Sequence, residues 1–185
     1  MPVLHTVFLM PNYRRAWTPG ATWFFTVNLV TRRGNDLLVR RIDLLRECVA
    51  RVKSLHPFRI DAWVVLPEHM HCIWTLPADD ADYPMRWRLI KTRFSRRLPA
   101  NEYRSATRAA RGERGIWQRR YWEHMIRDET DMRRHMDYVH INPVKHGWTN
   151  RVVDWPHSSF HAWVAKDVYP SDWAEDTELR VHGDE

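Results

Sequence analysis

Apolar positions recur along the chain with two different periods. Alternating apolar, aromatic and β-branched residues predict four strands: 21–32, 58–66, 69–76 and 116–126. Helical spacing of apolar residues predicts three helices: 36–55, 83–98 and 129–142. Only Pro67 and Glu68 separate the second and third strands, which predicts a tight antiparallel hairpin.

The predicted helix ends rest on local signals. Asn35 or Asp36 is the expected N-cap of the first helix, and Asp128 that of the last. The last helix is expected to end at Asn142, because a residue before proline is pushed away from helical geometry. Residues 99–116 show no clear period, and we predict a mobile basic loop there.

The resulting order is strand, helix, strand, strand, helix, strand, helix. It predicts an α+β fold: a ferredoxin-like sandwich with a largely antiparallel central sheet and the helices on one face. A chain of 185 residues suits a single domain with one core. We expect this domain to span 1–166, with 167–185 as an acidic C-terminal tail.

Several classes of protein are disfavoured by composition. No apolar run approaches the roughly 20 residues that cross a bilayer, so no membrane association is expected. The N-terminus lacks a basic leader followed by an apolar core, and we predict a cytoplasmic protein. Cys48 and Cys72 are the two cysteines, and we expect buried thiols and not a disulfide.

Charge points to a polyanionic partner. The formal net charge is +6 and the sequence pI is near 9.7, values typical of nucleic-acid binding. Residues 86–120 hold twelve Arg or Lys and two acidic residues, whereas 167–185 hold seven acidic residues and one Arg. A solvated helix face is the alternative for the basic run. The acidic tail either folds back over the basic surface and competes with DNA or only aids solubility.

The stretch PEHMHCIWTL carries the first candidate chemistry. In a strand, side chains alternate between faces, so His69 and His71 point one way while Met70 and Cys72 point the other. Two imidazoles that converge on one point are half of a metal site. Two satisfied core histidines are the alternative.

Tyr138 and Asn142 supply the second part. They stand four residues apart in the last predicted helix and therefore share one face. If that helix lies over His69 and His71, the Asn142 oxygen can join both imidazoles around a divalent cation. Such a set suits Mg²⁺ or Mn²⁺, and would equally accept Zn²⁺. A core tyrosine is the alternative for Tyr138.

Four blocks in order carry a family resemblance. They are NYRRAWTPGATWFFTVNL, AWVVLPEHMHCIW, YVHINPVKHG and DWPHSSFHAWV, and they extend over about residues 12–164. Together they resemble the HUH single-strand nucleases, in particular the REP-associated tyrosine transposases of the IS200-like group.

The resemblance implies an HUH nuclease fold and a metal-dependent enzyme that cleaves and rejoins single-stranded DNA at hairpin sites. It implies His69 and His71 as metal ligands and Tyr138 as the nucleophile that forms a 5′-phosphotyrosine. The ligand that follows the nucleophile by one turn falls on Asn142. The REP-associated branch implies a monomer, and the wider group a dimer.

Other residues are candidates for supporting roles. His140 lies about 200° around the helix from Tyr138, so we expect a structural or second-shell role. Lys145 and His146 either reach a phosphate or cover the helix C-terminus. The expected DNA contacts are Arg93, Arg96, Arg97, Arg119 and Arg120, with Arg14 and Arg15 in an N-terminal arm. The tryptophans that could stack on unpaired bases are Trp87, Trp117 and Trp122.

Two other functions remain open from sequence. The first is a DNA-hairpin-binding protein that regulates without cutting. The second is a metallohydrolase that uses a bound water, for which Tyr138 would be dispensable.

Overall fold

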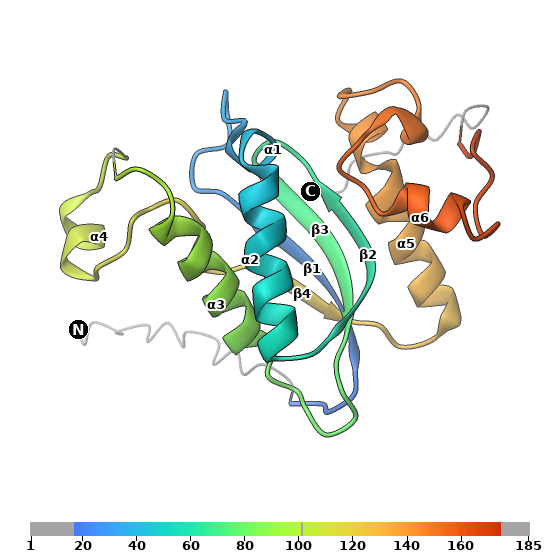
Figure 1. The fold of residues 1–185 in the computed structure, drawn as a ribbon, viewed down its shortest axis with the longest axis horizontal. Coiled ribbons are helices and arrows are strands. Elements are labelled where there is room, and N and C mark those ends of the chain that lie inside the picture. The colour runs from blue at the N-terminus through green and yellow to red at the C-terminus, as the bar shows by residue number, and fades with distance from the viewer. Residues whose placement is uncertain (1–16, 101, 175–185) are drawn as a thin grey trace, which may run out of the picture.

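A four-stranded antiparallel sheet forms the centre of the computed structural model, which describes residues 17–100 and 102–174 (Figure 1). Its strands are β1 (Thr22–Asn28), β2 (Arg59–Val65), β3 (His69–Thr75) and β4 (Trp122–Met125). The order across the sheet is β2-β3-β1-β4, and each neighbouring pair is antiparallel. The predicted α+β class and the β2–β3 hairpin are confirmed.

Helices cover both faces of this sheet (Figure 1). They are α1 (Leu37–Arg40), α2 (Ile42–Leu55), α3 (Tyr83–Arg96), α4 (Ala106–Ala110), α5 (Glu129–Lys145) and α6 (Phe160–Val164), with a short 3₁₀ helix, η1 (Val152–Asp154). The α2 and α3 helices lie on one face, and α5 and α6 on the other. The prediction that all helices share one face is therefore wrong.

Two cores replace the single core expected from chain length. Successive strand residues alternate between them, because Phe25 is buried toward α2 and α3 while Phe24 is buried toward α5. In the first core, Trp74 and Trp87 stack with ring centroids 4.1 Å apart. Trp87 is thus a core residue and not a base-stacking one. Cys48 and Cys72 are buried and unpaired, as predicted.

The same alternation sets the direction of the histidine pair. Met70 and Cys72 belong to the first core, whereas Ile73 belongs to the second, on the α5 side. His69 and His71 share the face of Ile73. The predicted division of β3 between two faces is confirmed.

Several predicted boundaries differ from the structure. The first helix breaks at Arg41, and the Asn35 side chain accepts a hydrogen bond from Leu37 N at 3.1 Å. The predicted strand over 116–126 is shortened to β4, preceded by an isolated bridge between Leu29 and Trp117. Among the described residues, no helix has the length and apolar character of a membrane span.

The predicted basic loop over 99–116 contains α4 and is held by Arg114. The guanidinium makes a bidentate ion pair with Glu102, with both N–O distances at 2.6 Å. It also donates to the carbonyl oxygens of Ser95, Leu98 and Pro99. These polar contacts of Arg114 hold the segment in place, although its sequence has no apolar pattern that would bury it.

The last helix does not end at Asn142. Pro143 lies inside α5, which continues to Lys145. Proline removes one backbone donor, but His146 N still donates to Asn142 O at 3.0 Å and Trp148 N to Pro143 O at 2.9 Å. Pro143 is also buried, so packing favours this last turn. At the other end, Asp128 caps the helix as predicted.

Candidate active site

The first two site residues come from β3. His69 and His71 are both buried, with ring centroids 5.0 Å apart. His69 Nδ1 lies 3.0 Å from Glu68 Oε1, and His71 Nδ1 lies 2.9 Å from Thr26 Oγ1. Partners on Nδ1 orient each ring and leave Nε2 for a ligand, as in many metal sites.

The α5 helix brings Tyr138 and Asn142 over these histidines. The Tyr138 ring meets the His71 ring edge-on at 5.1 Å, and its side chain remains 36% exposed. Asn142 is fully buried and its Nδ2 donates to Tyr138 O at 2.8 Å. That bond directs the Asn142 amide and keeps its oxygen available. The structure therefore assembles the three predicted ligands and the predicted nucleophile at one place.

Two buried atoms in this place have no hydrogen-bond partner among the described residues: His71 Nε2 and Asn142 Oδ1. Leaving such an atom unpaired costs about 1–3 kcal/mol. Burial, and then the neighbouring His69 and His146, hold the pKa of His71 well below its ordinary value, while the Asn142 side chain acts in the opposite direction. A neutral imidazole and an amide oxygen are lone-pair donors, so these side chains fit a divalent cation.

Lys145 and His146 border the site at the end of α5. Lys145 Nζ lies 5.2 Å from the centre of the Tyr138 ring. The His146 ring lies 5.1 Å from that of His69, and burial followed by His69 lowers the pKa of His146. Both are near enough to contact an anionic group bound between Tyr138 and the histidines.

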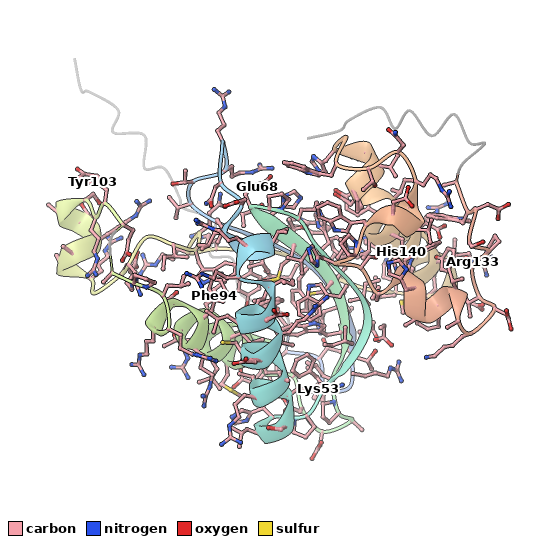
Figure 2. The ribbon with its side chains drawn as sticks, turned by 45° about the horizontal axis from the view of Figure 1, so that its top comes forward. Lys53, Glu68, Phe94, Tyr103, Arg133 and His140 are labelled. Carbon is pink, nitrogen blue, oxygen red and sulfur yellow. The ribbon has the colours of Figure 1, made fainter. Side chains whose placement is uncertain are left out.

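His140 lies elsewhere. Its ring is buried against Phe160 and Tyr169, between α5 and α6 (Figure 2). His140 Nε2 is 3.2 Å from Ser159 Oγ, and burial lowers the pKa of His140 to about 4. A neutral histidine that helps to pack α6 on α5 matches the structural role that was expected.

The predicted arginine contacts are spread over the molecule. Arg93, Arg96 and Arg97 belong to the α3 region, across the sheet from Tyr138. Arg97 Nη1 pairs with Glu47 at 2.6 Å, and Arg119 Nε with Glu113 at 3.4 Å. Arg120 is exposed just before β4. Arg14 and Arg15 lie outside the described residues. The three arginines of the α3 region therefore do not surround the tyrosine.

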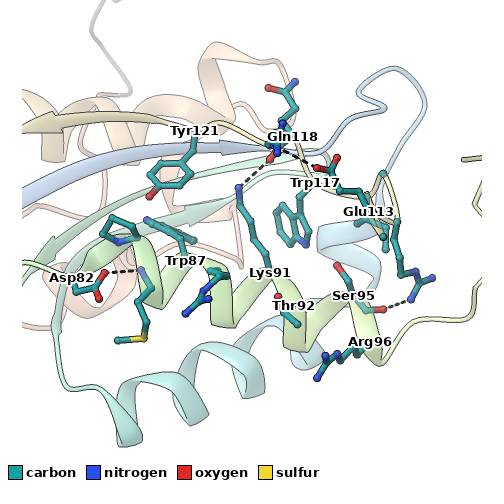
Figure 3. Close-up of a pocket in the computed structure, with 18 residues that line it drawn as sticks. Asp82, Trp87, Lys91, Thr92, Ser95, Arg96, Glu113, Trp117, Gln118 and Tyr121 are labelled. Carbon is teal, nitrogen blue, oxygen red and sulfur yellow. Dashed lines mark hydrogen bonds and ion pairs between the residues drawn. The ribbon is translucent and has the colours of Figure 1, made fainter. Parts of the chain in front are cut away.

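A cavity of about 820 Å³ lies between α3 and residues 112–121 (Figure 3). Its lining combines rings and cations: Trp87, Trp117, Tyr121, Arg88, Lys91, Arg96 and Arg119. Lys91 Nζ donates to Gln118 O at 3.1 Å across it. The cavity is on the first-core side of the sheet, so its charge suits phosphate groups that lie away from Tyr138.

One polar cluster was missed from sequence: His124, Asp131 and His135. Their potential ligand atoms all lie within 4.8 Å of one another, so they could hold a metal. The Asp131 carboxylate is already engaged, because Oδ2 is 2.9 Å from His124 Nε2 and accepts from Arg127 N and Nε at 3.1 Å each. Hydrogen bonding from Arg127, and then from His124, holds the pKa of Asp131 far below its usual range.

This cluster extends the face of α5 that carries the candidate site. Asp131, His135, Tyr138 and Asn142 follow one another at spacings of four, three and four, which is one helix face. That spacing was visible in the sequence. The contribution of His124 was not, because it comes from β4.

Curated and solved relatives match almost the whole chain. A REP-associated tyrosine transposase of Escherichia coli (strain K12) is 52% identical over 167 residues, which cover 90% of this chain and 93% of the relative. A Haemophilus influenzae protein named for the same family is 42% identical over 177 residues, 95% of this chain and 99% of that protein. No family model matches the chain.

The structural comparison agrees with the sequence comparison. A solved REP-associated tyrosine transposase bound to a REP hairpin superposes with a TM-score of 0.77 at 49% identity. The match covers 95% of this chain and 98% of the other.

Proposed function

Because the chain belongs to the family of REP-associated tyrosine transposases, we propose that Tyr138 is its nucleophile in cleaving and rejoining single-stranded DNA beside REP-like hairpins. The observation that carries this proposal is the contact of Tyr138 with His71, in a site that also holds His69 and Asn142. The exposure of the tyrosine leaves it accessible to a strand.

The reaction needs a nucleophile, a positioned phosphate and a covalent intermediate from which the strand can be rejoined. The Tyr138 oxygen attacks phosphorus, the bond from phosphorus to the 3′ oxygen breaks, and a 5′-phosphotyrosine and a free 3′-OH result. A later attack by a 3′-OH restores the phosphodiester, so no nucleotide cofactor is required. Lys145, beside the ring, favours the negative charge that develops as the phenol loses its proton.

His69, His71 and Asn142 are the proposed ligands of a divalent cation, Mg²⁺ or Mn²⁺. Their support is the pair of buried unpartnered atoms and the Nδ1 partners that aim the imidazoles. Such a cation would polarise the scissile phosphate and favour ionisation of the attacking hydroxyl.

The proposed substrate is a DNA hairpin with unpaired flanks, bound by a monomer in the cytoplasm. The relative solved with a REP hairpin supports the hairpin, and the net charge of +6 supports a polyanion. Arg96 and Arg119, which line the cavity beside α3, are proposed phosphate contacts.

The test compares wild type with Tyr138→Phe on labelled hairpin oligonucleotides, with Mg²⁺ or Mn²⁺ and with a chelator. We expect a protein–DNA adduct that survives denaturant in wild type only, and none after chelation. Tyr103→Phe is the matched control, because Tyr103 is 87% exposed and lies beside α4, far from α5 (Figure 2).

Other outcomes would favour the other functions. Cleavage that persists in Tyr138→Phe would support a water-using metallohydrolase. Tight hairpin binding without cleavage by either protein would support a regulatory DNA-binding protein.

A further inference from the structure

An exposed tryptophan lies in the same row of the sheet as the histidine pair. Thr26 on β1 pairs with His71 on β3 at one side and with Trp122 on β4 at the other. Neighbouring strands are about 4.8 Å apart, so Trp122 begins about 10 Å from His71 along this row. The Trp122 side chain is 54% exposed, and β4 is an edge strand.

Trp122 also faces the same side of the sheet as Tyr138. The buried Phe24 ring meets Trp122 edge-on at 5.5 Å and Tyr138 edge-on at 5.8 Å. Phe24 therefore separates the two exposed rings and keeps them within one surface. A strand that passes over Tyr138 toward the sheet edge would meet Trp122 next.

The Trp122 indole packs against His124, a member of the polar cluster of His124, Asp131 and His135. Trp122 lies parallel to His124, with centroids 5.8 Å apart and planes 4° apart. His124 is in turn bonded to Asp131 at 2.9 Å and stacked on His135 at 4.6 Å. These contacts fix the ring while more than half of its surface stays open. A rigid, open aromatic face is what base stacking requires.

We propose that Trp122 is a binding platform for an unpaired base of the substrate strand, within a few nucleotides of the phosphate that Tyr138 attacks. The inference rests on the proposed function and adds a base subsite to it. Stacking is tolerant of base identity, because every base has a π face. The platform therefore positions the strand and does not read its sequence.

The test measures binding and not cleavage, in a Tyr138→Phe background. Wild type first maps the cleavage position on the hairpin oligonucleotide, and fluorescence anisotropy then gives the dissociation constants. Trp122→Ala should weaken binding about 10-fold, whereas Trp122→Phe should retain most of the affinity. Tyr103→Ala, which removes an exposed ring far from α5, should leave affinity unchanged.

A second measurement separates stacking from general loss of fit. Unpaired nucleotides near the cleavage position are replaced one at a time by abasic residues. In the protein that retains Trp122, one such replacement should raise the dissociation constant about 10-fold. In Trp122→Ala the same replacement should have no further effect. If the losses of affinity from the abasic replacement and from Trp122→Ala are additive at every position, the stacking role of Trp122 is overturned and the proposed function is unaffected. Absence of cleavage of the hairpin oligonucleotide by wild type would overturn the proposed function itself.

Discussion

At the level of single residues, the Thr26 hydroxyl orients the imidazole of His71. This hydroxyl lies 2.9 Å from His71 Nδ1. In the tautomer that suits a cation, Nδ1 carries the proton and donates to the hydroxyl, so that the lone pair is on Nε2. Nε2 is buried and has no hydrogen-bond partner among the residues that the structure describes. Thr26 would thus prepare His71 for its proposed role as a ligand.

Thr26→Val should lower the affinity for the cation by about 10- to 100-fold, because it keeps the shape of the side chain and removes the acceptor. The dependence of adduct formation on Mn²⁺ concentration measures the change. Thr26→Ser keeps a hydroxyl and should restore most of the affinity. An unchanged Mn²⁺ dependence in the valine variant would contradict the role given to Thr26.

Short sequence spacings predicted which four candidate residues share a face, whereas their proposed roles came from the family resemblance. His69 and His71 follow from strand alternation, and Tyr138 and Asn142 from one helical turn. The link between His124 and Asp131 was not predictable, because it joins β4 to α5 and depends on how the two elements dock. Trp122 was one of three candidate stacking rings. It differs from Trp87 in being exposed, and the sequence does not show this difference.

At the level of elements, Arg114 determines the shape of the segment between α3 and β4. Its bidentate pair with Glu102 lowers the pKa of that carboxyl to about 2, and hydrogen bonding is the main cause. Because the pKa of Glu102 is lower in the folded protein, its ionisation stabilises the fold fully at pH values above the ordinary pKa of 4.5. This stabilisation is lost as the pH falls toward about 2.

Glu102→Gln should therefore reduce the free energy of unfolding by about 1 kcal/mol at neutral pH, as for a partly exposed ion pair. The difference from wild type should shrink as the pH falls below 4.5. Urea denaturation at neutral pH and at about pH 3 measures both values. Glu113→Gln, which removes the longer 3.4 Å pair with Arg119, should have a smaller effect. A loss that is independent of pH would count against the ion pair.

The existence and order of most elements were predictable because apolar periodicity is local. Their placement was less so. Nothing in the period of α5 says which face of the sheet it covers, since both faces of β1 and β3 are apolar. The continuation of α5 through Pro143 depends on burial of that proline, which is a tertiary effect.

At the level of the whole molecule, the arginines of α3 and the candidate active site lie on different sides of the sheet. Arg96 is exposed beside the α3 cavity, whereas Tyr138 lies on the α5 side. A hairpin that reaches both must extend around the edge of the protein. Contacts on the α3 side would then contribute affinity and not catalysis.

Arg96→Gln should weaken binding of hairpins with long flanks and reduce the salt dependence of binding by about one phosphate contact. The yield of adduct at saturating DNA should not change. Lys53→Gln, which removes one charge near the C-terminal end of α2, is the control (Figure 2). A fall in adduct yield at saturating DNA would show that Arg96 acts on the chemistry.

The division into two cores has a consequence for how the protein fails when heated. The proposed nucleophile belongs to the α5 layer and the histidines belong to the sheet between the layers. We expect that α5 can separate from the sheet while α2 and α3 still cover the other face. Tyr138 would then leave His71 although the stacked Trp74 and Trp87 remain in place. We therefore expect activity to be lost when α5 separates from the sheet, at a lower temperature than the one at which the fluorescence of the Trp74 and Trp87 pair changes.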